Sequence, residues 1–281
     1  TPLMDSQGNV TSHLSGLLYR NARLLKSQVK PVYVFDGEPD RLKKRELSRR
    51  REVKVEAQRK YEEALKKKDA VEARRQAART SRFTPEMLAE SRRVLELMGL
   101  PYVQAPGEGE AQCVHLCGRG DAEYVASQDY DAILFGARKL VRGLSLTRRQ
   151  ELELFRLEAV LEGLGVGWRD LIDLAILVGT DFNEGVKGIG AKKGLKAVKE
   201  GRVEEIASEA GLDLDSVRAV YLKHPVTDDY NVSFRPPDEE GLVDFLSRER
   251  DFGEERVRKV GKELMQAYKA SSQSSLGQWL S

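Results

Sequence analysis

The chain has 281 residues, of which 40% are hydrophobic and 33% are charged, and its formal net charge is +2. This composition predicts a globular protein with one large core, or one core and an appended module. The sequence contains no apolar run long enough to span a membrane and no signal-peptide pattern, so we expect an intracellular protein without a membrane partner.

Cysteine and histidine offer little catalytic potential in this sequence. Cys113 and Cys117 are spaced four residues apart on a predicted helix and lack the partners of a zinc site, so we expect reduced thiols in the core. The three histidines fall in no Ser/His/Asp or Cys/His arrangement, which leaves a nucleophilic mechanism with little support.

The charges are segregated along the chain. Residues 41–82 contain 17 Lys and Arg against 7 Asp and Glu, whereas the rest of the chain contains 30 against 38. A basic arm beside an acidic body indicates phosphate binding next to a metal centre.

The first predicted elements are a helix and a strand. A helix is predicted to begin at Thr11 or Ser12, and it carries leucines at helical spacing. Arg20 lies on this helix, and its default interpretation is a solvated surface residue. The near-continuous apolar run over 31–37 predicts a strand covered on both faces, which ends in Asp36. Active sites of open α/β sheets lie beyond the carboxyl ends of strands, so Asp36 is placed where a ligand would bind.

The segment that follows predicts a helical arm. Residues 41–79 are mostly helix formers, but their large apolar residues are too sparse for firm packing. We therefore expect an insertion that stands out from the body and becomes ordered on phosphates, with Lys43 and Arg50 at its start. A solvated charged helix is the alternative interpretation.

A second predicted strand leads into two glutamates. The pattern Thr-Pro-Glu at residue 84 begins a helix that ends at Gly99, and a short strand over 101–104 follows. Glu108 and Glu110 come next, in the loop or first turn of another helix, where the helix dipole favours carboxylates.

A third β-prone run, residues 124–135, carries Asp129 and Asp131. In an extended chain these side chains leave the same face, and they would repel each other unless a cation lay between them. Mg²⁺ is the usual cation, and two solvated turn aspartates are the alternative for this pair alone. The order of elements predicts an α/β fold with a mainly parallel central sheet flanked by helices.

The second half of the sequence reads as helical. Helices are predicted over 157–164 and 168–178, and the second leads to Asp181. A Gly-Ile-Gly turn then opens a helix and presents backbone N–H groups to an anion, although a tight helix–helix turn is the alternative. Lysines flank this turn at Lys187, Lys192 and Lys193, and further helices are predicted over 195–223 and 239–269.

The last residues, Ser271–Ser281, are expected to form a flexible tail. One short helical turn would bring four of its side chains together as a hydrophobic plug for a partner: Gln273, Leu276, Trp279 and Leu280. A frayed end that packs its tryptophan on the body is the alternative.

These motifs together resemble the structure-specific 5′ nucleases, and most of all the flap endonucleases of archaeal type. The resemblance covers nearly the whole chain and is carried, in the family's order and spacing, by Pro-Val-Tyr-Val-Phe-Asp-Gly, Ala-Pro-Gly-Glu-Gly-Glu-Ala, Ala-Ser-Gln-Asp-Tyr-Asp, Val-Gly-Thr-Asp, Lys-Gly-Ile-Gly-Ala-Lys-Lys and the closing Gln-x-x-Leu-x-x-Trp-Leu.

The resemblance implies a site with two Mg²⁺ ions. The first would be held by Asp36, Glu108 and Glu110, and the second by Asp129, Asp131 and Asp181. Lys43 and Arg50 match the basic pair at the base of the family's helical arch, which contacts the scissile phosphate.

The resemblance also implies contacts with DNA and with a sliding clamp. Residues near the DNA would include Arg20, Glu108, Gly179 and Asp181. Gly188 and Gly190 match a helix-two-turn-helix that grips the duplex and often carries K⁺. The segment 273–280 is similar to the clamp-docking motif, in which Leu280 replaces the second closing aromatic residue and implies weaker docking.

The implied function is that of a 5′ flap endonuclease and 5′-3′ exonuclease in DNA replication, including Okazaki fragment maturation, and in repair. It would act as a monomer on branched DNA, in the cytoplasm of an archaeon or the nucleus of a eukaryote. The implied regions are a nuclease region over 1–82 with its arch at about 41–82, a second over 83–269 with the helix-two-turn-helix at about 179–200, and a clamp-binding tail over 270–281.

Two alternatives accompany this interpretation. One is a related 5′ nuclease that prefers bubbles or gaps, and the other is a non-cleaving module that binds branched DNA and recruits the clamp. The family has a further metal-binding aspartate on a strand before the first helix, and the printed sequence begins after that position. On this expectation the first metal would have one ligand fewer in this sequence.

Overall fold

The computed structural model describes residues 3–43, 48, 59–60, 83–144 and 151–277, the last seven through their backbone alone. The chain divides into two compact units. The helical unit draws on Thr1–Tyr33, Glu52–Val103 and Tyr230–Ser281, and the sheet unit on Val34–Arg51 and Gln104–Asp229. Because both units combine distant segments, they do not follow the sequential regions inferred above, and that division stays a prediction.

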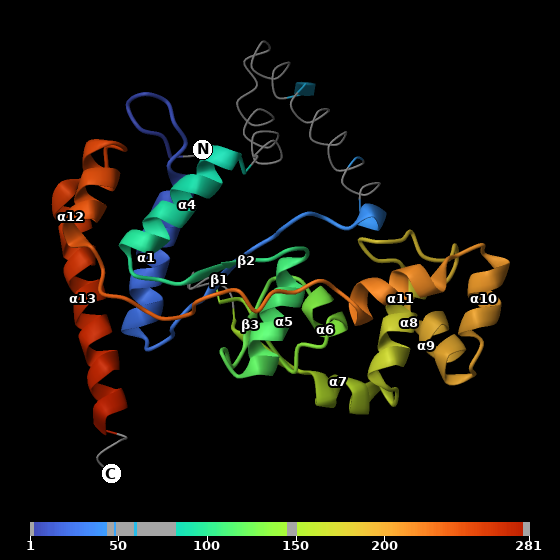
Figure 1. Cartoon of the computed structure of the whole chain (residues 1–281). Helices are drawn as coiled ribbons and strands as arrows, with labels where there is room; N and C mark the ends of the chain where they lie inside the picture. The colour runs from blue at the N-terminus through green and yellow to red at the C-terminus, as the bar shows by residue number, and fades with distance from the viewer. Residues whose placement is uncertain (1–2, 44–47, 49–58, 61–82, 145–150, 278–281) are drawn as a thin grey trace. The chain divides into compact units, whose positions relative to one another are not determined.

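The helical unit is a bundle. Its members are α1 (Ser12–Lys26), α4 (Pro85–Leu97), α12 (Glu239–Leu242), a π-helical turn (Val243–Arg248) and α13 (Glu254–Gly277). α1 packs against both α4 and α13 (Figure 1). Leucines at helical spacing form the core, and Leu14, Leu18 and Leu246 have no exposed surface. The predicted helices of this unit are therefore confirmed by the faces that they bury.

The start and end of α4 follow from its sequence. Thr84 Oγ1 accepts a hydrogen bond from Met87 N at 3.2 Å, and Pro85 occupies the first turn, where a missing N–H costs nothing. The helix ends before Gly99, whose φ of +70° suits glycine.

Strands β1 (Tyr33–Phe35) and β2 (Tyr102–Gln104) form a two-stranded sheet. Tyr33 N donates to Pro101 O, and Ala105 N donates to Phe35 O. Both predicted strands are thus confirmed, and both end where acidic residues follow.

The sheet unit contains a three-stranded sheet. Its strands are β3 (Val125–Ala126), β4 (Lys139–Arg142) and β5 (Glu153–Arg156). β3 pairs with β4 in parallel, and β4 pairs with β5 in antiparallel register. The α/β class is confirmed. The described strands form two small sheets. β4 and β5 were not foreseen because each is short and has only two adjacent apolar residues between charged ones.

Helices complete the sheet unit. They are α5 (Gly109–Arg119), α6 (Asp131–Leu134), α7 (Leu157–Leu164), α8 (Trp168–Val178), α9 (Ala191–Lys199), α10 (Val203–Glu209) and α11 (Leu214–Leu222). α8 packs against α9, α10 and α11, as Figure 1 shows. The predicted bounds of α7 and α8 are confirmed.

The C-terminal segment differs from the flexible tail that the sequence predicts. α13 continues to Gly277, because no proline or glycine interrupts the run of residues 262–276 and an established helix extends at low cost. Trp279 and Leu280 lie outside the described residues, so the clamp-docking prediction is not tested at these positions.

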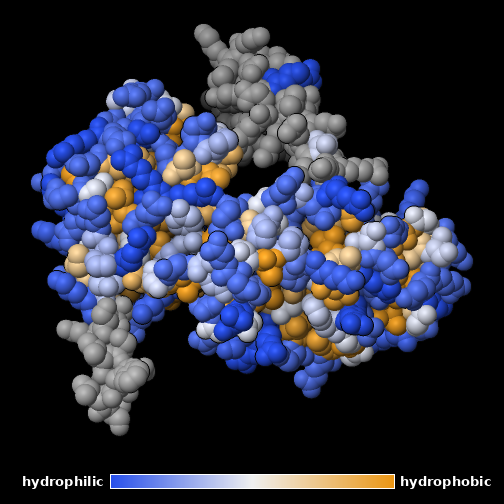
Figure 2. All heavy atoms as spheres, viewed as in Figure 1, coloured by the Kyte–Doolittle hydropathy of each residue, from blue (hydrophilic) through white to orange (hydrophobic). Residues whose placement is uncertain are grey.

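Hydrophilic side chains dominate the face seen in Figure 2, and apolar side chains show between them. In the part of the chain that the structure describes, every helix is too short or too polar to cross a membrane.

Candidate metal centre

The site is built where β1 meets the N-terminus of α5. Asp36 directly follows β1, and its Oδ1 accepts a hydrogen bond from Gly109 N at 2.8 Å. A Cβ at position 109 would lie 2.7 Å from Asp36 Oδ1, so only glycine lets the carboxylate reach the helix. Glu108 is the N-cap residue of α5 and Glu110 lies in its first turn. The helix N-terminus thereby collects three carboxylates that its dipole favours.

Lys43 supplies a positive charge among these carboxylates. It ends a 3₁₀ turn (Arg41–Lys43), and its Nζ donates to Glu108 Oε2 at 2.6 Å and lies 3.6 Å from Asp181 Oδ2. Burial lowers the pKa of Lys43, but the hydrogen bond with Glu108 and the nearby carboxylates outweigh it, so the net pKa is raised. The ammonium therefore stays charged.

Asp129 and Asp131 reach the site from a turn, and the prediction that they extend a strand was wrong. β3 ends at Ala126, and Asp131 is the first residue of α6. Ser127 Oγ accepts from Asp129 N at 3.0 Å, and Asp129 Oδ1 accepts from Asp131 N at 3.3 Å. Such side-chain bonds to the backbone bend a chain in spite of its β propensity.

Asp181 is placed by a tight turn after α8. Gly179 has a φ of +111°, and a Cβ there would lie 3.0 Å from Glu184 O. Thr180 Oγ1 accepts from Phe182 N and donates to Asn183 Oδ1 at 2.8 Å, which fixes the loop on either side of Asp181. Gly179 thus acts on the site by shaping the turn.

Burial, and after it repulsion among the carboxylates, raises two pKa values in the site. Burial, together with the charges of Asp129 and Asp131, raises the pKa of Glu110 to about 7, although its bond from Ser127 opposes the rise. Burial and the neighbouring carboxylates, Asp129 first, raise the pKa of Asp131 to about 6. The site therefore carries more negative charge than Lys43 compensates.

Three buried aromatic side chains pack together next to the site. Tyr221 of α11 has no exposed surface, and its ring lies 5.0 Å from that of Phe135 and 5.5 Å from that of Phe182, between ring centroids. Phe135 follows α6 and Phe182 follows Asp181, so one tyrosine braces both acidic segments. The Lys43 ammonium lies 5.5 Å from the Phe182 ring centroid.

The donor set fits divalent cations that prefer oxygen. Among the described residues, no group of three Asp, Glu, His or Cys side chains is already arranged to hold a metal ion. Lys43 instead lies among them, and its charge partly offsets the rise in the pKa of Glu110 and of Asp131. Carboxylate oxygens with excess negative charge are the ligands that Mg²⁺ and Mn²⁺ select. The assignment of individual ligands stays a prediction.

Other predicted site residues lie elsewhere. Arg50 falls outside the described residues, and Arg20 is exposed on α1 of the helical unit. The Gly-Ile-Gly turn ends in Gly190, the N-cap residue of α9, and Gly188 has a φ of +85°. A Cβ at Gly188 or Gly190 would meet nothing within 4 Å, and the flanking lysines are exposed: Lys187, Lys192 and Lys193. An anion therefore has open access to this turn.

Sequence reasoning missed two supporting residues. Ser127 Oγ donates to Glu110 Oε1 at 2.6 Å and so connects α5 to the Asp129 turn. Ser127 could have been found from the sequence because it lies two residues before Asp129. Tyr221 has no such local signal, since only tertiary packing brings it to the site.

The chain was compared with known proteins. The model of the XPG N-terminal domain matches residues 1–57, and that of the XPG I-region matches residues 99–181. Flap endonuclease 1 of Pyrococcus furiosus is 47% identical over 99% of this chain and 86% of its own length. That of Methanobrevibacter smithii is 44% identical over 99% of this chain and 86% of its own.

Solved structures agree with these matches. Flap endonuclease-1 from Methanococcus jannaschii superposes with a TM-score of 0.79 at 41% identity, covering 96% of this chain and 86% of that one. The catalytic core of Rad2 in complex with DNA substrate covers 90% of this chain and 86% of its own, with a TM-score of 0.67 at 24% identity, and shows a shared fold.

The fold and the two matched family models are those of a nuclease of the XPG type. Within that class, the chain belongs to the flap endonuclease 1 family. The resemblance inferred from the sequence motifs is confirmed.

Proposed function

We propose that this protein is a structure-specific 5′ flap endonuclease and 5′-3′ exonuclease that cleaves branched DNA near the base of a 5′ flap, in replication and repair. The observation that carries the proposal is the convergence of carboxylates from four segments around Lys43. Membership of the flap endonuclease 1 family supports the substrate class.

The proposed centre holds two Mg²⁺ ions, one on Asp36, Glu108 and Glu110 and the other on Asp129, Asp131 and Asp181. When bound, such ions lower the pKa of a water and stabilise charge on the phosphate and leaving oxygens. Ser127 orients Glu110, and Gly109 N orients Asp36, so the protein fixes these carboxylates before any ion arrives.

Lys43 is the proposed electrostatic partner of the scissile phosphate. Its raised pKa keeps the ammonium charged, and it lies among the carboxylates, so a phosphate bound there would gain a charge-assisted hydrogen bond. Arg50 is proposed for the same role on the strength of the sequence resemblance.

The Gly188–Gly190 turn is proposed to hold the phosphate backbone of the duplex. The open space around both glycines and the exposed Lys187, Lys192 and Lys193 support this role, because backbone contacts hold DNA without reading its sequence. A K⁺ ion at this turn belongs to the same proposal, as do DNA contacts of Arg20 and Gly179.

Cleavage of a labelled substrate tests the function. A double-flap DNA labelled at its 5′ end is mixed with the protein and Mg²⁺, and the Asp129→Asn/Asp131→Asn variant serves as control. We expect a short labelled product from the original chain alone. Binding by both proteins without a Mg²⁺-dependent product would favour the non-cleaving module, and preferred cleavage of bubbles or gaps would favour the related nuclease.

A sliding clamp is the proposed partner, and it would bind residues 273–280. The protein is proposed to act as a monomer, in the cytoplasm of an archaeal cell or in the nucleus of a eukaryotic one. Deletion of residues 271–281 should abolish stimulation by the clamp and leave basal cleavage intact. Stimulation that survives the deletion would contradict this part of the proposal.

A further inference from the structure

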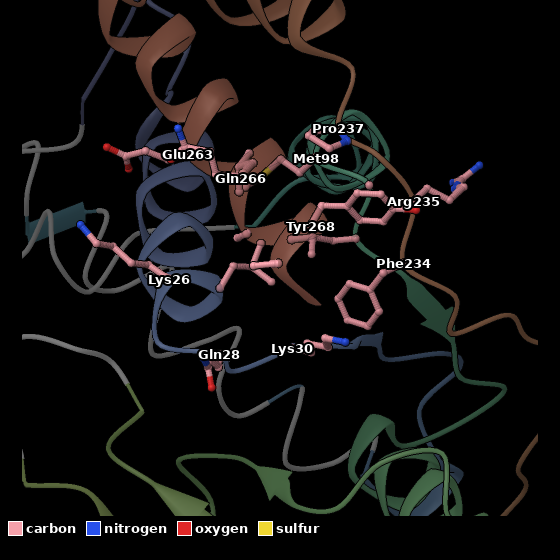
Figure 3. Close-up of a pocket in the computed structure, with 16 residues that line it drawn as sticks. Lys26, Gln28, Lys30, Met98, Phe234, Arg235, Pro237, Glu263, Gln266 and Tyr268 are labelled. Atoms are coloured by element: carbon pink, nitrogen blue, oxygen red, sulfur yellow. The ribbon is translucent and has the colours of Figure 1, made fainter. Parts of the chain in front are cut away.

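The helical unit contains a cavity of about 620 Å³ that the nuclease centre does not use. It is bordered by the end of α1, the Met98–Leu100 turn, the extended segment Phe234–Pro237 and the middle of α13, from Glu263 to Ala270, as Figure 3 shows. Its volume falls within the range of small-molecule sites, about 300–1,000 Å³.

The cavity has an apolar floor and aromatic sides. Met98, Leu100 and Leu264 are at most 2% exposed and belong to the core. The rings of Phe234 and Tyr268 border the open space in Figure 3. An aromatic face beside an apolar floor favours a flat, partly apolar group such as a nucleobase.

The rim is positively charged. Lys26, Lys30 and Arg235 line the cavity with a single carboxylate, that of Glu263. Lys30 Nζ lies 5.8 Å from the centroid of the Phe234 ring, which puts an ammonium next to an aromatic face. A ligand with a phosphate beside its ring would match both features.

The wall that carries Phe234 is fixed in place. Arg235 N donates to Gly99 O at 3.0 Å, and Asp238 N donates to Leu97 O at 2.8 Å. Gly99 permits this approach, since a Cβ there would lie 2.0 Å from Arg235 O. A preformed wall keeps the ordering cost of binding small.

We propose that this cavity binds a nucleoside phosphate, with the base against Phe234 and Tyr268 and the phosphate at Lys30 and Arg235. The ligand is either a free nucleotide or an unpaired nucleotide within a DNA strand. An apolar peptide would offer no anion to the three cations on the rim, which outnumber the one carboxylate that lines the cavity. The site lies within the helical unit, so it goes beyond the proposed cleavage function.

Calorimetric titration in EDTA tests the proposal. Without divalent ions cleavage is absent, and variants of the cavity distinguish binding there from binding to the exposed lysines at the Gly188–Gly190 turn. We expect dAMP or the hexamer (dA)6 to bind, and Phe234→Ala or Lys30→Glu to weaken binding at least tenfold. Binding of dAMP identifies a free nucleotide as the source, and binding of the hexamer alone identifies a strand.

A matched pair in the sheet unit provides the control. Lys139 Nζ lies 4.8 Å from the Tyr124 ring centroid, outside the cavity. Tyr124→Ala and Lys139→Glu should leave nucleotide binding unchanged. Absence of binding to both probes, or equal binding by all variants, would overturn the proposal. Flap cleavage is measured separately in Mg²⁺ on the same variants. Failure of nucleotide binding can then be told apart from failure of the proposed nuclease function.

Discussion

The ammonium of Lys43 lies 2.6 Å from Glu108 Oε2 and 3.6 Å from Asp181 Oδ2. One side chain therefore joins two acidic segments that are distant in the sequence. Since like charges so close are costly to keep, the protein holds its carboxylates together through this lysine in the absence of other cations.

Replacing Lys43 with methionine should remove that charge and slow cleavage of a saturating flap substrate by about 10²–10³-fold, the usual effect of losing one group that stabilises developing charge. Single-turnover rates in Mg²⁺ measure it. Lys139→Met is the matched control, because Lys139 pairs with Glu123 at the surface. Equal rates for Lys43→Met and the original chain would show that the lysine has no part in the reaction.

Gly109→Ala should weaken divalent metal binding without altering any charge. The added methyl would lie 2.7 Å from Asp36 Oδ1, so the carboxylate must move. Loss of such an orienting contact usually lowers metal affinity by about 10–100-fold. Mn²⁺ titration followed by electron paramagnetic resonance gives the affinity.

Gly118→Ala is the control for this experiment, since it lies on the same helix with nothing within 4 Å of the new methyl. If both alanine variants bind Mn²⁺ like the original chain, the position of Asp36 does not matter for the ion.

Tyr221→Phe should change the free energy of unfolding by no more than about 1 kcal/mol. Tyr221 Oη is buried close to the Thr180 side chain, but it makes no hydrogen bond of good geometry with the described residues, so the hydroxyl contributes little. Tyr221→Ala should instead cost about 3–5 kcal/mol because it leaves a cavity between Phe135 and Phe182. Urea unfolding measures both; destabilisation of several kcal/mol by Tyr221→Phe would reveal a hydrogen bond that this account lacks.

The metal-free protein should lose stability as the pH rises from about 4 to 8. The pKa of Glu110 is raised to about 7 and that of Asp131 to about 6, so the folded protein binds these protons more tightly than the unfolded chain. This stability is complete below the ordinary carboxyl pKa and is lost once both groups ionise.

Unfolding in EDTA at several pH values tests this dependence, with Glu110→Gln as the control that should reduce it to the part due to Asp131. Mg²⁺ at a hundredfold excess over its Kd should restore about 2.7 kcal/mol at pH 8. A pH dependence identical in Glu110→Gln and the original chain would contradict the proposed origin.

The sequence located much of the candidate site because glycines and strand ends mark it. Asp36 after an apolar run, Glu108 and Glu110 between glycines, and Asp181 after a helix all lie where the pattern predicted. These positions depend on local chemistry that short segments encode.

Features set by tertiary contacts could not be read in this way. The hydrogen bond from Ser127 is one example, because its hydroxyl donates to Glu110 Oε1 on a different segment of the chain. Tyr221 is brought under the site by packing of rings from three segments. The division into two units likewise arises from contacts between α1, α4 and α13, which are far apart in the chain.

Crystals grown with Mn²⁺ and measured at the manganese absorption edge test the central claim most directly. The account predicts anomalous peaks among Asp36, Glu108, Glu110, Asp129, Asp131 and Asp181, with Lys43 displaced from Glu108. Crystals that show no peak among these carboxylates at saturating Mn²⁺, or peaks only at other sites, would contradict it.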